Sequence, residues 1–83
     1  MTEVLLSERA RNRLAELEPD IQSRIKDSLR DITPERDLSP LSGEDVFKFR
    51  VGDYRVIIDW DQTNDTVYVL TLGHRRNIYD REW

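Results

Sequence analysis

A two-residue turn between two strand-like segments constrains the fold of this chain more than any other feature. Val46–Val51 alternates between apolar and charged side chains, and Tyr54–Trp60 is rich in residues that favour strands. Gly52 and Asp53 stand between these segments, and glycine tolerates the positive φ that a two-residue hairpin loop requires. The sequence therefore predicts a tight antiparallel hairpin.

This turn also fixes which side chains share a face of the sheet. With Val51 opposite Tyr54, Arg50 lies opposite Arg55, and directly opposed residues point to the same side. One face then carries the apolar residues Phe47, Phe49, Val56 and Ile58, and the other carries Lys48, Arg50 and Arg55. Like charges directly opposite each other are destabilising, so this face needs a compensating partner, which an anionic ligand would provide.

The residues before the hairpin predict a short strand and two helices. Thr2–Leu6 is a strand candidate, and Ser7 is a suitable N-cap for a helix with the apolar stripe Ala10, Leu14 and Leu17. Pro19 suits the first turn of a second helix, whose stripe is Ile21, Ile25, Leu29 and Ile32. Because almost no residues separate the helices, they should form an antiparallel hairpin.

A loop and a third strand complete the expected order of elements. Thr33–Glu44 contains two prolines, serines and a glycine and predicts a loop that Leu38 and Leu41 attach to the core. Thr66–Gly73 predicts a strand antiparallel to the second one, which would bring the following residues beside the hairpin turn. Its register stays open, because the Asp61–Asp65 turn could be wound in several ways.

The composition sets this cationic cluster against an acidic background. The 83 residues, which we expect to form a single domain over 1–83, contain 13 Lys and Arg against 17 Asp and Glu, a net charge of −4. A second basic segment, Leu72–Tyr79, holds the only histidine and no acid. Concentrated positive charge on an acidic chain indicates a local anion site, and the phosphate of RNA is the anion we favour.

Several other classes of protein are disfavoured by the composition. The chain has no cysteine, a single histidine and no acidic spacing like that of an EF-hand loop, so we expect no metal and no cofactor. Its apolar runs are too short to cross a bilayer and its first residues do not resemble a signal peptide. We therefore expect a cytoplasmic protein without a membrane partner.

Several motifs together resemble the RelE toxins of the RelE/ParE superfamily. They are Leu41-Ser42-Gly43, the segment Phe47–Val56 with its Gly-Asp-Tyr-Arg turn, and Val69–Tyr79 with Gly-His-Arg-Arg followed by tyrosine. The resemblance implies an α+β fold of the order β-α-α-β-β-β, in which an N-terminal strand and an antiparallel helical hairpin accompany a mainly antiparallel four-stranded sheet. It also implies a toxin that cuts mRNA in the ribosomal A site without a metal and is neutralised by a RelB-like antitoxin.

The resemblance also implies which residues carry the activity. By motif position they are Lys48, Arg50, Arg55, Arg75 and Tyr79, with His74 as a possible supporting residue. The chain departs from the family at Arg50, where a lysine is usual, and at His74, whose position is often basic.

RNA cleavage of this kind uses the ribose 2′-hydroxyl as the nucleophile and leaves a 2′,3′-cyclic phosphate. Arg55 is the candidate for stabilising the phosphorane, because a guanidinium fork matches phosphate oxygens and stays charged. Lys48 is the candidate base, since positive neighbours favour its neutral form. Arg50 would hold phosphate. A solvated surface arginine is the simpler alternative for Arg55, and an edge-strand lysine that discourages aggregation is the alternative for Lys48.

The C-terminal candidates leave more alternatives open. Arg75 could stabilise the leaving oxygen, His74 could act as an acid or be purely structural, and Arg76 is expected to pair with a surface carboxylate. Tyr79 could stack on a base or cover the sheet edge. Trp60 is expected in the core, and Trp83 is expected to contact the antitoxin.

Two other functions compete with the ribonuclease. A ParE-like protein that binds gyrase would share the architecture without cutting RNA, and an inactive homologue would only titrate antitoxin. Opposed cations favour RNA over both. Direct DNA binding is disfavoured, because residues 1–42 carry 7 basic and 9 acidic side chains and no helix shows a basic face.

Overall fold

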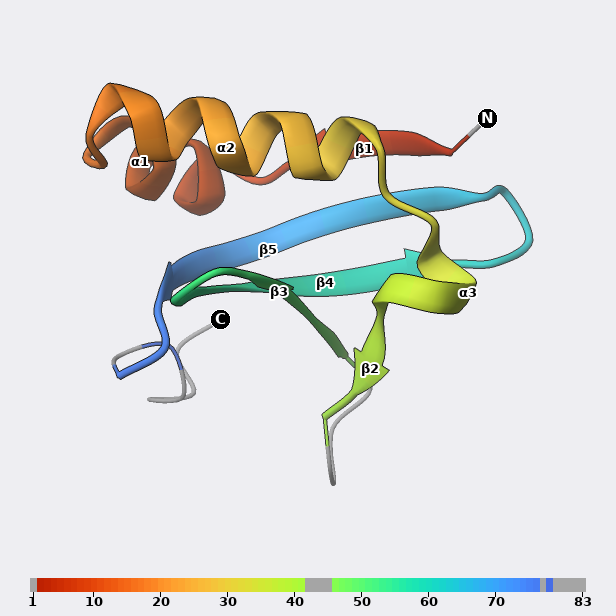
Figure 1. The fold of residues 1–83 in the computed structure, drawn as a ribbon. Coiled ribbons are helices and arrows are strands. Elements are labelled where there is room, and N and C mark those ends of the chain that lie inside the picture. The colour runs from red at the N-terminus through yellow and green to blue at the C-terminus, as the bar shows by residue number, and fades with distance from the viewer. Residues whose placement is uncertain (1, 42–45, 77, 79–83) are drawn as a thin grey trace.

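A five-stranded sheet with a helical hairpin on one face forms the centre of the computed structural model, which describes residues 2–41, 46–76 and 78 (Figure 1). The elements are β1 (Glu3–Leu6), α1 (Glu8–Ala15), α2 (Pro19–Arg30), α3 (Pro34–Asp37), β2 (Ser39–Pro40), β3 (Phe47–Val51), β4 (Tyr54–Asp61) and β5 (Thr66–His74). The strand order is β1-β5-β4-β3-β2. Only the β1–β5 pair is parallel, so the sheet is mainly antiparallel as predicted.

The predicted fold class is confirmed, but the sheet has five strands where four were predicted. The difference lies in Thr33–Glu44, which was predicted as a loop and contains α3 and β2 in its described part. Pro34 begins α3, where its missing N–H costs nothing, and Pro40 lies in an edge strand, where it is tolerated. Both elements are too short for a periodic pattern to show in the sequence.

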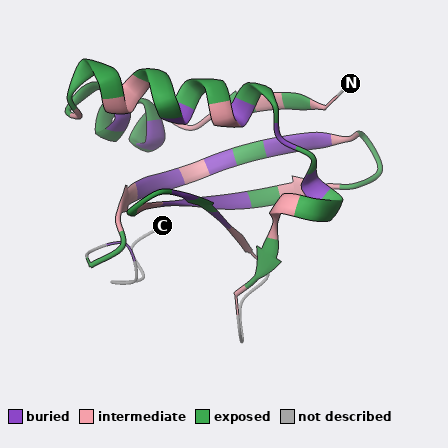
Figure 2. Cartoon of the chain, viewed as in Figure 1, coloured by how far each residue is buried: buried purple, intermediate pink, exposed green. Residues whose placement is uncertain are grey.

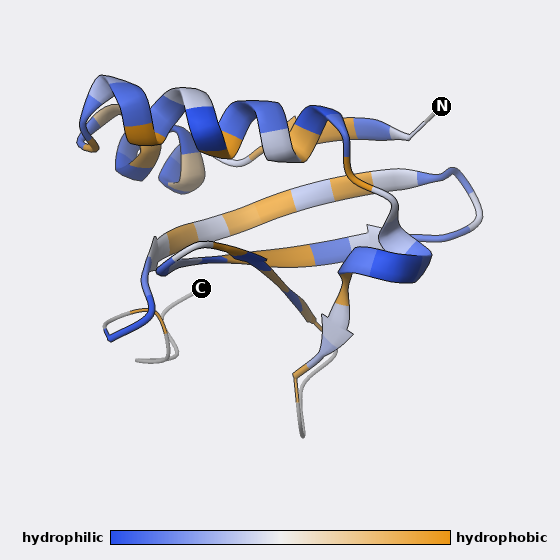
Figure 3. Cartoon of the chain, viewed as in Figure 1, coloured by the Kyte–Doolittle hydropathy of each residue, from blue (hydrophilic) through white to orange (hydrophobic). Residues whose placement is uncertain are grey.

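The helical hairpin forms at the predicted positions. The Ser7 hydroxyl accepts a hydrogen bond from the Ala10 N–H at 3.0 Å, which caps α1, and also donates to the Leu70 carbonyl at 2.7 Å. Pro19 opens α2 as its first residue. Both helices turn their apolar residues toward the sheet and their polar residues outward (Figure 3). Within the described residues, no helix is long and apolar enough to span a membrane.

The β3–β4 hairpin has the predicted register. Val51 pairs with Tyr54, and Arg50 pairs with Arg55 across the turn. Gly52 adopts φ +57°, the positive value that this turn requires. The face toward the helices is buried (Figure 2). Its core cluster consists of Ala10, Leu14, Ile25, Leu29, Ile32, Phe49, Val51, Val56, Ile58, Val67, Val69 and Leu72, with Leu38 and Trp60 packed against it as expected.

A β-bulge between β4 and β5 sets the register that the sequence left open. Ile58 pairs with Val69, but its neighbour Ile57 pairs with Thr71, so Leu70 is the extra residue. The bulge reverses the alternation along β5, because one added residue moves every later side chain to the other face. Gly73 therefore lies opposite Arg55, and His74 lies opposite Tyr54 on the helix-facing side.

Candidate active site

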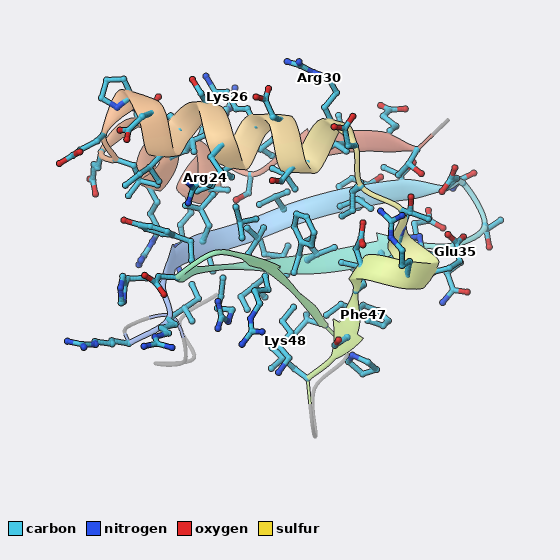
Figure 4. All side chains as sticks on the ribbon, in the orientation of Figure 1. Arg24, Lys26, Arg30, Glu35, Phe47 and Lys48 are labelled. Atoms are coloured by element: carbon cyan, nitrogen blue, oxygen red, sulfur yellow. The ribbon has the colours of Figure 1, made fainter. Side chains whose placement is uncertain are left out.

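Three of the predicted site residues line one pocket of about 350 Å³ on the sheet face that points away from the helices. We call this surface, which carries Lys48, Arg50 and Arg55, the cationic face. The pocket is lined by Lys48, Arg50, Arg55, Asp37 and Ser39. Lys48 extends from β3 on the side opposite α1 and α2 (Figure 4). The β3–β4 register alone is enough to bring these three cations together.

Arg55 is fixed by the hairpin turn itself. Arg55 is only 7% exposed, and its Nη1 donates hydrogen bonds to the carbonyl oxygens of Gly52 and Tyr54, each at 2.9 Å. These carbonyl dipoles compensate part of the cost of burying a charge. They also orient the guanidinium, whose remaining N–H donors lie on Nε and Nη2.

Lys48 and Arg50 are held more loosely than Arg55. Lys48 is half-buried between its partners Ser39 on β2 and Ile57 on β4, whereas Arg50 is exposed. Within the described residues, the salt bridges join Arg30 to Asp27 and Arg36 to Asp37. The three cations of the pocket therefore make no ion pair with any carboxylate in that part of the chain.

The sequence reasoning missed Asp37 and Ser39. Asp37 ends α3, and its carboxylate accepts from Arg36 Nε at 2.8 Å, from Arg36 Nη2 at 3.2 Å and from the Thr33 N–H at 2.9 Å. The hydrogen bond from Arg36, followed by that from Thr33, lowers the pKa of Asp37 below its usual range. The carboxylate is therefore ionised at neutral pH. Only the fold of the predicted loop brings these two residues to the pocket, so no sequence signal could have found them.

The described residues after β5 approach the hairpin turn but do not line the pocket. The Arg75 N–H donates to the Asp53 carbonyl at 2.8 Å, which places its backbone beside the turn as predicted. The His74 ring packs edge-to-face against Tyr54, with centroids 5.6 Å apart, and its Nδ1 accepts from the Arg76 N–H at 3.2 Å. His74 thus belongs to the helix-facing side, and Arg76 is exposed without a salt bridge to the described residues. Tyr79 and Trp83 lie outside the described residues.

An apolar side chain lies close to Gly73, the partner of Arg55 on β5. A Cβ on Gly73 would lie 3.5 Å from the Cδ1 of Ile78, whose residue is only 4% exposed. Ile57 and Thr71, which pair with each other on this same face, are also buried. The cationic side chains thus lie next to groups shielded from water, and such surroundings strengthen electrostatic attraction to an anion.

Two arginines from the helices join the turn end of the sheet. Arg24 extends from α2 toward the sheet, whereas Arg30 points away from it (Figure 4). The Nη1 of Arg24 lies 3.4 Å from the position that a Cβ on Gly52 would occupy. The Nη1 of Arg13 lies 3.9 Å from the position that a Cβ on Gly73 would occupy. Neither helix has a basic face, yet each contributes one cation to this end of the sheet. A single arginine on each helix is close enough to the strands to do so.

This arrangement suits binding of a phosphodiester. Three side chains that only donate hydrogen bonds surround a pocket of nucleotide-compatible size, and two of them are guanidinium groups that can hold phosphate oxygens in pairs. In residues 2–41, 46–76 and 78, no group of three or more His, Asp or Glu side chains could hold a metal ion.

Comparisons with known proteins agree with this fold. Residues 4–79 match the family model described as the ParE toxin of the type II toxin–antitoxin system parDE. A chain of the toxin–antitoxin complex RelBE2 from Mycobacterium tuberculosis is 29% identical with a TM-score of 0.80, over 89% of this chain and 91% of that one.

More distant structures share the same fold. A chain of the intact RelBE toxin–antitoxin complex of E. coli is 20% identical with a TM-score of 0.68, over 89% of this chain and 96% of that one. A chain of the RelB–RelE complex of Methanococcus jannaschii is 24% identical with a TM-score of 0.68, over 92% of this chain and 95% of that one. No curated protein matched the sequence.

Proposed function

This chain belongs to the ParE toxin family of type II toxin–antitoxin systems, within the RelE/ParE superfamily, and from that premise we propose that it cuts mRNA in the ribosomal A site. The observation that carries the proposal is the pocket in which Lys48, Arg50 and Arg55 converge without a carboxylate bound to any of them among the described residues. A toxin that acted only by binding a protein would not need opposed cations that line a pocket.

In the proposed reaction, the ribose 2′-hydroxyl attacks the adjacent phosphate and expels the 5′-oxygen of the next nucleotide. Arg55 stabilises the charge that develops on the phosphorane, because the turn carbonyls already hold its guanidinium in place. Arg50 holds a phosphate oxygen, and Lys48, when its amine is neutral, accepts the proton of the 2′-hydroxyl. Arg75 stabilises the leaving oxygen, and Tyr79 stacks on a base.

The partners of this function are a ribosome carrying mRNA and a cognate antitoxin. The similar chains from M. tuberculosis, E. coli and M. jannaschii are parts of toxin–antitoxin complexes, which supports a RelB-like antitoxin for this chain. Such a protein would neutralise the toxin most directly by covering the cationic face. Trp83 would contribute to that contact.

The test is expression of the protein in a translating extract, followed by mapping of mRNA 5′ ends. Arg50→Ala is the informative variant, because Arg50 is exposed and its loss leaves the fold intact, whereas Arg55 also supports the turn. Arg30→Ala is the matched control, since Arg30 is an exposed arginine that points away from the sheet.

We expect codon-phased cuts with the wild type and with Arg30→Ala, and at least a tenfold loss with Arg50→Ala, about the effect of one lost charge-assisted hydrogen bond. Intact mRNA together with DNA cleavage by gyrase would replace this proposal with the ParE-like alternative. If neither substrate were cut although antitoxin still bound, the chain would be an inactive homologue.

A further inference from the structure

Asp37 introduces a negative charge into a pocket whose other described lining residues are three cations and Ser39, and neither the phosphate contacts nor the proposed proton acceptor requires it. The carboxylate is anchored, with 20% of its side chain exposed, by hydrogen bonds from Arg36 and Thr33. A carboxylate that lines a phosphate pocket weakens phosphate binding by repulsion. Its position therefore calls for a partner other than the phosphate itself.

Hydrogen-bonding capacity identifies that partner. When charged, Lys48, Arg50 and Arg55 only donate hydrogen bonds, so among the described side chains of the pocket the acceptors belong to Asp37 and Ser39. A carboxylate offers about four lone-pair positions. The hydrogen bond from Arg36 Nε occupies one lone-pair position on Oδ1. Those from Arg36 Nη2 and the Thr33 N–H occupy the two positions on Oδ2. One position on Oδ1 therefore remains for a ligand that donates.

We propose that Asp37 is a positioning residue that accepts a hydrogen bond from the ribose 2′-hydroxyl of the nucleotide whose 3′-phosphate is held by Lys48, Arg50 and Arg55. The 2′-hydroxyl is carried by the carbon next to the one that bears this phosphate, so both groups enter the same pocket. The inference rests on the proposed function and adds to it the means by which the site distinguishes RNA from DNA.

This role differs from that of a general base. Because its pKa is lowered, the Asp37 carboxylate is a weak proton acceptor that stays ionised, which suits a lasting hydrogen bond rather than proton removal. The bond would point the hydroxyl hydrogen toward Asp37 and leave the oxygen lone pairs free to face phosphorus. Lys48, which pairs with Ser39 on the adjacent strand, would take this proton once the hydroxyl rotates away from Asp37.

The experiment measures binding of short single-stranded oligonucleotides to the free protein by fluorescence anisotropy. Three strands of one sequence are compared, with 2′-hydroxyl, 2′-deoxy and 2′-O-methyl sugars, and the last keeps the oxygen but cannot donate. For the wild type we expect the 2′-hydroxyl strand to bind about tenfold tighter than the other two, as one hydrogen bond to a charged group provides. This comparison needs no substitution and so does not depend on the folding of a variant.

Three substitutions then separate the hydrogen bond from simple charge. Asp37→Ala should tighten binding of all three strands, because it removes a negative charge, and should abolish the preference for the 2′-hydroxyl. Asp31→Ala is the matched control. Asp31 lines a neighbouring cavity with Arg50 and Asp37 but does not line this pocket. It should also tighten binding and should keep the tenfold preference. Asp37→Asn, which retains an acceptor for the Thr33 N–H, should keep only part of the preference.

Equal binding of the three strands to the wild type would overturn the assignment, as would a preference that survives in folded Asp37→Ala or a protein that binds no strand at millimolar concentration. These outcomes are separable from the failure of the proposed function. Cuts in the extract without a 2′-hydroxyl preference would refute the role of Asp37 alone. A preference that depends on Asp37 without any cuts would refute the ribonuclease alone.

Discussion

The two faces of the β3–β4 hairpin are built from the same alternating sequence but are stabilised in opposite ways. On the helix-facing side, Phe49, Val56 and Ile58 are buried against α1 and α2 and need only apolar neighbours. On the cationic face, Arg50 and Arg55 lie directly opposite each other, and only Arg55 is buried. One face supplies stability, whereas the other gives up some stability to hold positive charge in place.

The charged side chains on the cationic face are held in place mainly by backbone groups, unlike the apolar side chains on the helix-facing side. The carbonyl oxygens of the hairpin turn hold Arg55, and the Asp53 carbonyl holds the backbone of Arg75. Carboxylates would neutralise the site, but carbonyl dipoles orient a guanidinium and leave its charge available for a ligand. The comparison of the two faces can be tested by the following substitutions.

The largest expected effect comes from the helix-facing side. Ile58 is fully buried, so Ile58→Ala should lower the free energy of unfolding by about 2–5 kcal/mol, through lost apolar burial and a cavity. Lys48→Ala, on the opposite face of the same hairpin, should change it by less than about 0.5 kcal/mol while reducing RNA cleavage. Urea denaturation of both variants measures the contrast, and similar losses of stability would abolish it.

Arg55→Ala should combine the two kinds of effect. It removes the hydrogen bonds to Gly52 and Tyr54, so the free energy of unfolding should fall by about 1–3 kcal/mol, and it should also abolish activity. Arg50→Ala is the control that should lose activity with little loss of stability. If urea denaturation showed that the two variants were equally stable, the carbonyls would not be what fixes Arg55.

Gly52→Ala should have a smaller effect. Alanine at φ +57° is strained, which should cost about 1 kcal/mol, although its Cβ would make only an ordinary contact with Arg24 at 3.4 Å. The strain should also tilt the Gly52 carbonyl that holds Arg55 and so weaken RNA binding. Asp53→Ala, at the other turn position, serves as the control. Thermal unfolding that was the same for both variants would argue against a turn that requires positive φ.

The smallest effect is expected from acid. The pKa of Asp37 is lowered in the folded protein by Arg36, so its stabilising contribution is complete above the unfolded value of about 3.9 and is lost as the pH falls through the lower folded value. Asp37→Asn should therefore flatten the decline of stability below about pH 4. Urea midpoints measured at pH 2–7 for both proteins provide the check, and parallel curves would contradict the ion pair.

The sequence could predict the architecture and the hairpin register because local patterns encode them. Alternation, the Gly52 turn and the helix caps are signals carried by neighbouring residues, so the pairing of Arg50 with Arg55 followed directly. The placement of His74 could not be predicted in this way, because it depends on the β-bulge at Leu70, and the residues around Leu70 give no local signal for a bulge. Asp37 reaches the pocket only through the fold of α3 and β2, which have four and two residues.

We expect cations on the cationic face, and not positive charge in general, to bind the RNA backbone. The most direct test is the salt dependence of single-stranded RNA binding for Lys48→Ala/Arg50→Ala and for Lys26→Ala/Arg30→Ala, a matched pair on α2. Each lost phosphate contact should reduce the slope of log K against log salt by about 0.7. We predict a reduction of about 1.4, or two such contacts, for the first pair and none for the second. Equal reductions of the slope in both pairs, or no reduction in the first pair, would contradict this expectation.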